Sequence, residues 1–361
     1  MIVTELDEIR ERFGDARRTE IVEAEGDISI EDLVPDEEVV VTVSHAGYVK
    51  RVPLTEYRAQ GRGGKGLRAM DTRDQDFVSW VFVVNAHANV LFLSDKGKAY
   101  LKKVYQIPET SRAARGRAVV NLVGMEPDER VAAILPIREF VEDGYLLTCT
   151  RRGRVKRTNL SAYENIRQTG IIGVAIGEGD GLLTARIVTP GQHVLIGTSR
   201  GMSIRFPVED VRAMGRDSMG VKGIELREGD FVIGMDIIED QSDQQVLTVS
   251  ANGYGKRTKV ADWRTQNRGG KGIIGMDTSE RNGALVKLRL VSPEDQLMVI
   301  TNGGQVIRTR VSEIRETGRN TQGVRVIRLR EAEQVVDVEP VAEGEEGEEG
   351  EIPESEEPQA N

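Results

Sequence analysis

The stretch VVVTVSHAGYVKR, residues 39–51, is the first of six similar segments in this chain. It consists of a mostly apolar run, a Ser or Thr, a short turn that contains glycine, and a second run that ends in Lys or Arg. An apolar strand, a turn with glycine where φ must be positive, and a returning strand are typical of a β-hairpin. The other copies are VLFLSDKGKAYLK (90–102), LLTCTRRGRVKR (146–157), VLIGTSRGMSIR (194–205), VLTVSANGYGKR (246–257) and LMVITNGGQVIR (297–308).

The six segments recur at nearly constant spacing along the chain. Their turn glycines are separated by 50, 56, 48, 52 and 51 residues. About 20 residues after each hairpin comes a second glycine-bearing segment, and then a further apolar strand. Each repeat therefore supplies roughly four strands and cannot bury its apolar face alone, so neighbouring repeats must stack. This pattern predicts an all-β fold, a propeller-like array of six blades.

The two ends of the chain differ from the repeats. Leu6, Ile9 and Phe13 have the spacing of an amphipathic helix. We expect this short helix and an acidic linker to occupy residues 1–37, and the six repeats to occupy 38–338. Residues 339–361 are dominated by Glu and carry too few apolar side chains to order themselves, so a disordered acidic tail is expected there.

Charge is distributed unevenly over these three parts. The whole chain has a formal net charge of −10. Residues 39–330, however, hold 45 Lys and Arg against 32 Asp and Glu, a net charge of +13 between two acidic ends. A basic body favours a polyanionic partner, and an acidic tail could compete for the same surface. Charge alone equally allows a solvated surface with a tail that only adds solubility.

Composition argues against catalysis and metal binding. Cys149 is the only cysteine, so neither a disulfide nor a cysteine-based metal site is expected, as is usual in a reducing cytoplasm. His45, His87 and His193 match no metal-ligand spacing. We expect no metal, no cofactor and no catalytic residue in this chain.

A cation group closes the second strand of each hairpin. Because each repeat contributes one group, a radial array would place them in a ring, where they could bind a polyanion. A single Lys-Arg pair is usually part of a solvated surface. Six cation groups at equivalent positions of the repeats favour a role in binding. The predicted contacts are Lys50, Arg51, Lys102, Lys103, Lys156, Arg157, Arg205, Lys256, Arg257, Arg308 and Arg310, with Arg115, Arg117, Lys222, Arg319 and Arg325 near the second glycine segment.

The sharpest local motif is QGRGGKG at residues 60–66, with a near copy, QNRGGKG, at 266–272. Glycines let a backbone approach a phosphate closely, and Arg and Lys add charge-assisted hydrogen bonds. A flexible turn with two solvated cations is the alternative. Residues 61–66 formally match the dinucleotide fingerprint G-x-G-x-x-G, but they lie in a β repeat and not in a βαβ unit. The predicted phosphate contacts are Gln60, Arg62, Gly63, Gly64, Lys65 and Gly66, with Arg268 and Lys271 in the second copy.

QGRGGKG resembles the signature heptapeptide Q-[R/K]-R-G-G-[R/K]-G of the C-terminal domain of the bacterial DNA gyrase A subunit. VPLTEYRAQ, ARGRAVVNL and RTRVSEI resemble the same family, and the similarity runs along the whole chain. The resemblance implies a six-bladed β-pinwheel, in which blades exchange strands and DNA wraps around the outer rim to direct negative supercoiling. Gly61 departs from the usual basic residue, which puts the strength of this phosphate site in doubt. The related topoisomerase IV subunit, which lacks an intact heptapeptide, is the alternative.

The resemblance also implies partners and a location. DNA breakage, ATP and Mg²⁺ would belong to other parts of the parent topoisomerase, so this chain alone would not be an enzyme. Its partners would be double-stranded DNA, the gyrase B subunit in an A2B2 complex, and the N-terminal domain of the same subunit. The isolated chain would be monomeric, cytoplasmic and associated with the nucleoid. A propeller that binds proteins is a rival class, which the six-fold cation pattern argues against.

Overall fold

The computed structural model describes residues 2–15, 31–56, 78–111, 114–239, 243–303, 305–330 and 332–341. The chain divides into one unit that ends at Pro35 and a second that begins at Asp36. The first unit contains helix α1 (Ile2–Phe13), where the apolar spacing predicts it, and the 3-10 turn η1 (Glu31–Leu33). No helix within the described ranges is long and apolar enough to cross a membrane.

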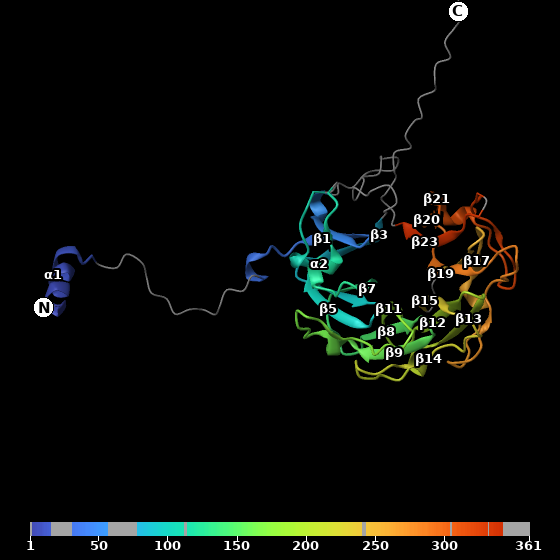
Figure 1. Cartoon of the computed structure of the whole chain (residues 1–361), viewed down its shortest axis with the longest axis horizontal. Helices are drawn as coiled ribbons and strands as arrows, with labels where there is room; N and C mark the ends of the chain where they lie inside the picture. Colours follow the sequence, from blue (N-terminus) through green and yellow to red (C-terminus); the bar gives the residue numbers. More distant parts are fainter. Residues whose placement is uncertain are drawn as a thin grey trace, which may run out of the picture. The chain divides into compact units, whose positions relative to one another are not determined.

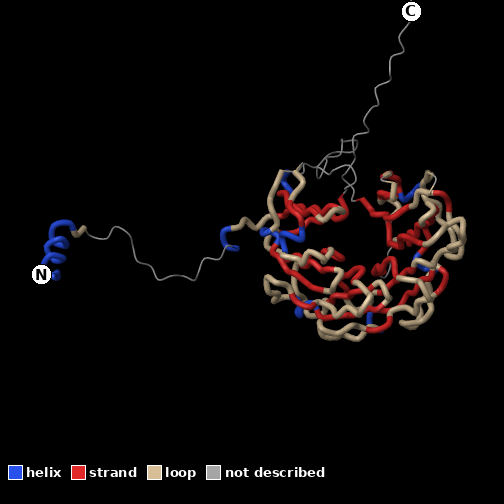
Figure 2. Tube along the Cα trace, viewed as in Figure 1, coloured by secondary structure: helices blue, strands red, loops and turns tan. Residues whose placement is uncertain are grey.

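The second unit is a six-bladed β-propeller (Figures 1 and 2). Each repeat supplies three antiparallel strands to its own blade, and the first strand of the hairpin lies between the second strand and the inner strand. The blades, in chain order, are β1 (Glu38–Ser44), β2 (Tyr48–Pro53) and β3 (Val78–Asn85); β4 (Asn89–Ser94), β5 (Lys98–Lys103) and β7 (Val131–Ile137); β8 (Tyr145–Thr150), β9 (Arg154–Asn159) and β11 (Leu182–Val188); β12 (His193–Thr198), β13 (Met202–Pro207) and β15 (Val232–Ile238); β16 (Gln245–Ser250), β17 (Tyr254–Lys259) and β19 (Leu285–Val291); and β20 (Gln296–Thr301), β21 (Val306–Arg310) and β23 (Val335–Val341).

The fourth strand of a blade comes from the next repeat. Each of these two-residue strands pairs antiparallel with the second hairpin strand of the preceding blade, so the strand exchange implied by the resemblance is present. Among the described residues, blades one to five have this exchanged strand and blade six has three strands. The exchanged strands are β6 (Arg117–Ala118), β10 (Ile171–Ile172), β14 (Val221–Lys222), β18 (Ile273–Ile274) and β22 (Val324–Arg325).

Short helical elements connect the strands. Each hairpin is followed by a 3-10 turn, and helix α2 (Val119–Val123) follows β6. The hairpin glycines adopt the positive φ expected of them, from +76° at Gly153 to +84° at Gly97, while the sixth, Gly304, lies outside the described residues. The turns are η2 (Leu54–Glu56), η3 (Val104–Gln106), η4 (Leu160–Tyr163), η5 (Val208–Asp210), η6 (Val260–Asp262) and η7 (Val311–Glu313).

The inner strands surround the axis of the propeller. β23 of blade six lies next to β3 of blade one, and Trp80 and Glu339 from these two strands line the same central cavity of about 130 Å³. The inner strands of the first and last blades therefore lie side by side. β23 runs to Val341, three residues past the boundary expected at residue 338, so Glu339 belongs to a blade and not to the tail.

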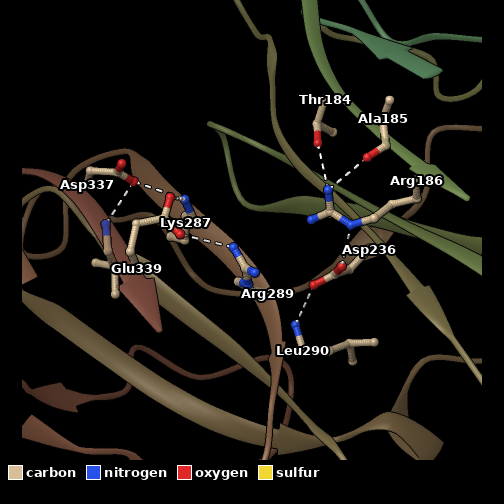
Figure 3. Close-up of polar contacts among 10 residues, drawn as sticks. Thr184, Ala185, Arg186, Asp236, Lys287, Arg289, Leu290, Asp337 and Glu339 are labelled. Carbon is tan, nitrogen blue, oxygen red and sulfur yellow. Dashed lines mark hydrogen bonds and ion pairs between the residues drawn. The ribbon is translucent and has the colours of Figure 1, made fainter. Parts of the chain in front are cut away.

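Ion pairs connect the inner strand of blade three to that of blade four, and the inner strand of blade five to that of blade six (Figure 3). Arg186 of β11 pairs with Asp236 of β15 at 3.2 Å. Lys287 and Arg289 of β19 both reach Glu339 of β23, at 2.6 and 3.0 Å. Partial burial reduces screening by solvent, so removing one partner of such a pair leaves a charge that water compensates poorly.

We expect Glu339→Ala to lower the free energy of unfolding by about 2 kcal/mol, because it leaves the partly buried Lys287 and Arg289 without a shared carboxylate. Urea denaturation measures the change. Glu139→Ala, at an exposed glutamate outside the strands, is the matched control and should stay within about 0.5 kcal/mol of wild type. Equal stabilities of the two variants would contradict this role for Glu339.

Candidate nucleic-acid interface

Three lysines that the sequence predicts to contact DNA lie inside the blades instead. Lys50, Lys156 and Lys256, on β2, β9 and β17, have no exposed surface. Their ammonium groups cannot reach a phosphate outside the molecule, so these three predicted contacts are corrected. Burial lowers the pKa of Lys156 and of Lys256 to about 8, which still leaves both side chains charged at neutral pH.

The buried ammonium groups hold backbone carbonyls of the loop that precedes the exchanged strand. Lys50 Nζ donates to Ala114 O at 2.9 Å, and Lys256 Nζ donates to Gly318 O at the same distance. A buried ammonium needs such acceptors, and buried carbonyls need such a donor. Each lysine therefore fixes the next repeat's loop against its own blade. The loop carbonyls that accept from these lysines include Ser111 and Ala114 for Lys50, Gly215 and Arg216 for Lys156, and Gly318 and Arg319 for Lys256. Lys156 Nζ also donates to Gly173 O in its own repeat.

This arrangement recurs in every second blade. In blades one, three and five the lysine lies opposite a threonine in the hairpin register, whereas in blades two, four and six both positions are apolar or aromatic. The exchanged strands alternate in the same way. Those of blades one, three and five carry the exposed cations Arg117, Lys222 and Arg325. Those of blades two and four carry Ile172 and Ile274, which are 58% and 41% exposed.

The second cation of several hairpins fastens one repeat to the next. Arg51 Nε donates to Ile107 O at 2.9 Å, and Arg205 Nη1 donates to Trp263 O at 3.3 Å. Arg257 Nε donates in the same way to Ile314 O. All three carbonyls belong to the residue that ends the next repeat's 3-10 turn. Each of these guanidinium groups therefore uses at least one of its N–H groups for a hydrogen bond within the chain.

The second heptapeptide, residues 266–272, also has a structural role. Arg268 Nε donates to Asp210 O at 2.9 Å, and its Nη1 donates to Lys222 O on the preceding exchanged strand. Gly272 has φ +74°, and a Cβ there would lie 2.4 Å from Ser203 O, so this glycine allows two segments of the chain itself to approach closely. Lys271 is exposed and remains a candidate for DNA. The first heptapeptide, Gln60–Gly66, lies outside the described residues.

The other predicted contacts divide into exposed and half-buried side chains. Arg115 lies over the Tyr48 ring at 3.6 Å, and Arg157 lies over the Tyr145 ring at 4.6 Å. Lys103 Nζ donates to His87 O at 3.1 Å. The exposed set is Arg117, Lys222, Lys271, Arg308, Arg310 and Arg325, and the half-buried set is Arg51, Lys102, Lys103, Arg115, Arg157, Arg205, Arg257, Arg268 and Arg319.

Two exposed arginines beside Arg325 are not marked by the sequence pattern. Arg281 lies in the loop before β19, and Arg328 follows β22. Neither belongs to the recurring hairpin, so no repeat pattern identifies them. Within the described residues no group of His, Cys, Asp or Glu could hold a metal ion. Cys149 is fully buried, and burial raises the pKa of its thiol well above the ordinary value.

Comparison with known families matches each of the six blades. Residues 38–85, 88–138, 144–189, 192–239, 244–292 and 295–342 each match the model of the DNA gyrase C-terminal domain, described as a beta-propeller. The chain belongs to the DNA gyrase C-terminal domain family. The matched segments coincide with the hairpin repeats and end within or just after the inner strand of each blade.

Gyrase relatives extend the similarity along almost the whole chain. The DNA gyrase A subunit of Staphylococcus aureus strain MRSA252 is 45% identical over 345 residues, which cover 95% of this chain and 39% of the relative. The corresponding Staphylococcus epidermidis protein is 43% identical over the same coverage. The chain thus spans about two fifths of the curated gyrase subunits that it matches.

Solved structures in the gyrase and topoisomerase IV families share the fold. The C-terminal domain of DNA topoisomerase IV aligns over 85% of this chain and 94% of that chain, with a TM-score of 0.75 and 25% identity. A DNA gyrase A C-terminal domain aligns over 85% and 100%, with a TM-score of 0.65 and 27% identity.

Proposed function

We propose that this gyrase-family chain binds double-stranded DNA around its outer rim and bends it, so that the wrap directs negative supercoiling by a type II topoisomerase. The observation that supports the proposal most is the row of exposed cations on exchanged strands of successive odd blades, Arg117, Lys222 and Arg325. A duplex that follows the rim would pass these positions in turn. Their guanidinium and ammonium groups bind phosphate without reading sequence.

The charge of the chain is sufficient to neutralise part of a bent DNA duplex. Duplex DNA carries one charge per about 1.7 Å, so a path of roughly 100 Å presents about 60 charges. The net charge of +13 on residues 39–330 can match only those phosphates that face the rim. Bending costs roughly 1–6 kcal/mol per 40–90° of turn, and several phosphate contacts must offset it. We therefore expect binding governed by charge and DNA bendability, with weak sequence preference.

The proposed partners follow from the gyrase relatives. We infer that the chain acts in the cytoplasm beside the gyrase B subunit, together with the N-terminal domain of its own subunit, and that alone it neither cleaves DNA nor hydrolyses ATP. A corresponding role in topoisomerase IV is the second candidate, since a topoisomerase IV domain shares this fold with a TM-score of 0.75.

A topoisomer assay tests the proposal. Nicked plasmid is sealed by ligase in the presence of the chain, and the trapped linking-number change is measured. Wild type should shift the linking number. The double variant Lys222→Glu and Lys271→Glu should shift it by roughly half as much or less, because two phosphate contacts become repulsions.

Lys96→Glu together with Lys259→Glu is the matched control. These lysines are also exposed and give the same change in net charge, but they lie in a hairpin turn and at the end of a hairpin strand. They should reduce the shift much less. No linking-number change with wild type at any protein-to-DNA ratio would rule out wrapping by the chain alone.

A further inference from the structure

Three arginines converge on an open pocket at the edge of blade five. The pocket has a volume of about 550 Å³, and its lining contains no carboxylate. Two loops supply the charges: Arg281 lies before the inner strand β19, and Arg325 and Arg328 lie on and after the exchanged strand β22. The lining residues are Tyr254, Arg281, Arg325, Val326, Ile327 and Arg328.

Tyr254 organises two of these guanidinium groups. Arg281 Cζ lies 4.2 Å from the centroid of the Tyr254 ring, and Arg325 Cζ lies 5.7 Å from it. Arg325 Nη2 also donates to the phenol oxygen at 3.2 Å. Cation–π attraction and this hydrogen bond bring two like charges together on one aromatic ring. The pKa of Tyr254 is held below its ordinary value by hydrogen bonds from Arg325 and Arg281, as expected in a positive field.

The surrounding loops hold Arg281 in place before any ligand arrives. Arg281 Nη1 donates to Gln322 Oε1 at 2.8 Å, and Gln322 in turn donates to Ser279 Oγ at 3.0 Å. The side chain of Asn252 donates to Arg281 O at 3.0 Å. The buried Lys256 fixes the loop at Gly318 that leads into β22. Ordered arginines lose little side-chain entropy when they bind an anion.

Their charge is not neutralised by the chain itself. In the described part of the molecule none of Arg281, Arg325 and Arg328 forms an ion pair with a carboxylate. Like charges at short range repel one another. An anion between them would remove that repulsion and accept several charge-assisted hydrogen bonds. The flat guanidinium matches the geometry of phosphate oxygens in particular.

We propose that Arg281, Arg325 and Arg328, arranged around Tyr254, form a binding site for one phosphodiester group of duplex DNA. This assignment rests on the proposed function. The site would fix the position of the duplex at blade five. Blade one has Tyr48 with a single stacked arginine, Arg115, at the corresponding end of its second strand, and blade three has Arg154 there. Among the described residues of these three blades, only those of blade five combine the tyrosine with three arginines.

The experiment compares two triple variants that lose the same charge. In one, Arg281, Arg325 and Arg328 are replaced by Gln; in the control, the exposed Arg130, Arg138 and Arg227 are replaced by Gln. Affinity for a short duplex is measured against salt, and matched thermal unfolding confirms that both variants are folded. The pocket variant should bind about 10- to 100-fold more weakly at fixed salt, and its log–log salt slope should become less negative by about 1, as expected for the loss of one phosphate contact. Equal losses of DNA affinity in the two variants would show that only net charge matters, and would overturn the assignment of this site.

Tyr254 variants and inorganic phosphate separate the remaining alternatives. Tyr254→Phe keeps the ring and should change DNA affinity less than twofold, whereas Tyr254→Ala removes the platform and should weaken it about 3- to 10-fold. Calorimetry with inorganic phosphate tests the small-anion alternative. Phosphate binding that disappears in the pocket variant, while DNA binding stays at the wild-type level, would assign the site to a free anion and overturn the DNA assignment. If wild type fails to bind DNA at all, the proposed function fails with it, and the phosphate titration alone shows whether the pocket is an anion site.

Discussion

Raising the salt concentration from about 50 to about 200 mM is expected to lower the affinity of this chain for duplex DNA by about 10⁴-fold. The number follows from counting cations that can touch phosphate. Six predicted contacts are exposed in the described residues, and the first heptapeptide adds Arg62 and Lys65 as predicted contacts. Eight contacts give a log–log slope of about −7, since each contact contributes about −0.9.

Fluorescence anisotropy with a labelled duplex measures this slope directly. The exposed Lys222 should contribute to it, so Lys222→Gln should make the slope less negative by about 1. The buried Lys156 should not contribute to the salt slope. Lys156→Met should therefore leave the slope unchanged, even if the chain becomes less stable. A response to salt that is flat in wild type would exclude phosphate-based wrapping.

Replacing either buried lysine by methionine should strongly destabilise the propeller. Met keeps most of the hydrocarbon volume of Lys156 or Lys256 but donates no hydrogen bond. Removing the Lys256 ammonium leaves the carbonyls of Gly318 and Arg319 without their donor, and each lost hydrogen bond to a charged group costs about 1.5–3 kcal/mol. We expect each variant to lose about 2–4 kcal/mol in urea denaturation. Lys222→Met, on an exposed strand, is the control and should change stability by less than about 0.5 kcal/mol.

The same lysines make a prediction about pH. Burial lowers the pKa of Lys156 to about 8, whereas an unfolded lysine titrates near roughly 10.4. Between these two values the folded chain binds fewer protons than the unfolded chain, so this lysine makes unfolding less favourable as pH rises. The stability of wild type relative to Lys156→Met should therefore increase from about pH 8 to about pH 10 and stay constant below about pH 8. Taking the difference cancels the titration of tyrosines and Cys149, and a decrease over this window would contradict the burial of a charged lysine.

The hairpins were predictable because their signal is local. Apolar runs and turn glycines at Gly47, Gly97 and their equivalents mark each hairpin where the structure has it. The exchanged strands were not predictable from local pattern, since two residues such as Ile171 and Ile172 have no periodicity of their own. Their partners lie in the preceding repeat, and only the family resemblance implied the exchange.

The buried lysines show where the expectation from strand alternation was wrong. Adjacent residues of a strand point to opposite faces, and a sheet with one solvated face would expose one member of the pair Lys50 and Arg51. In a propeller each blade is covered on both faces by its neighbours. Val49 and Lys50 are therefore both buried although they are adjacent. The available signal was the threonine opposite each buried lysine, which recurs in alternate repeats.

The second heptapeptide, residues 266–272, was predicted to bind phosphate, but most of it has a structural role. Its glycines and arginine have the composition of a phosphate site, but composition does not say which oxygen the backbone approaches. In the structure Arg268 binds carbonyls of the chain, and only Lys271 remains exposed for DNA. Arg325 was predicted as a contact, but the pocket around Tyr254 was not, because Arg281 and Arg325 come from segments that meet only in the folded blade.

The exchange of strands also sets an order of events during synthesis of the protein. Tyr48 of blade one pairs with Ala118, which lies 70 residues later in the chain. At 5–20 residues per second a ribosome needs about 4–14 s to make that stretch. Each of blades one to five must therefore wait, with an unpaired edge, until the following repeat has been translated. Unpaired edges invite pairing with other chains, so a nascent propeller of this kind is most vulnerable to aggregation one repeat behind the point of synthesis.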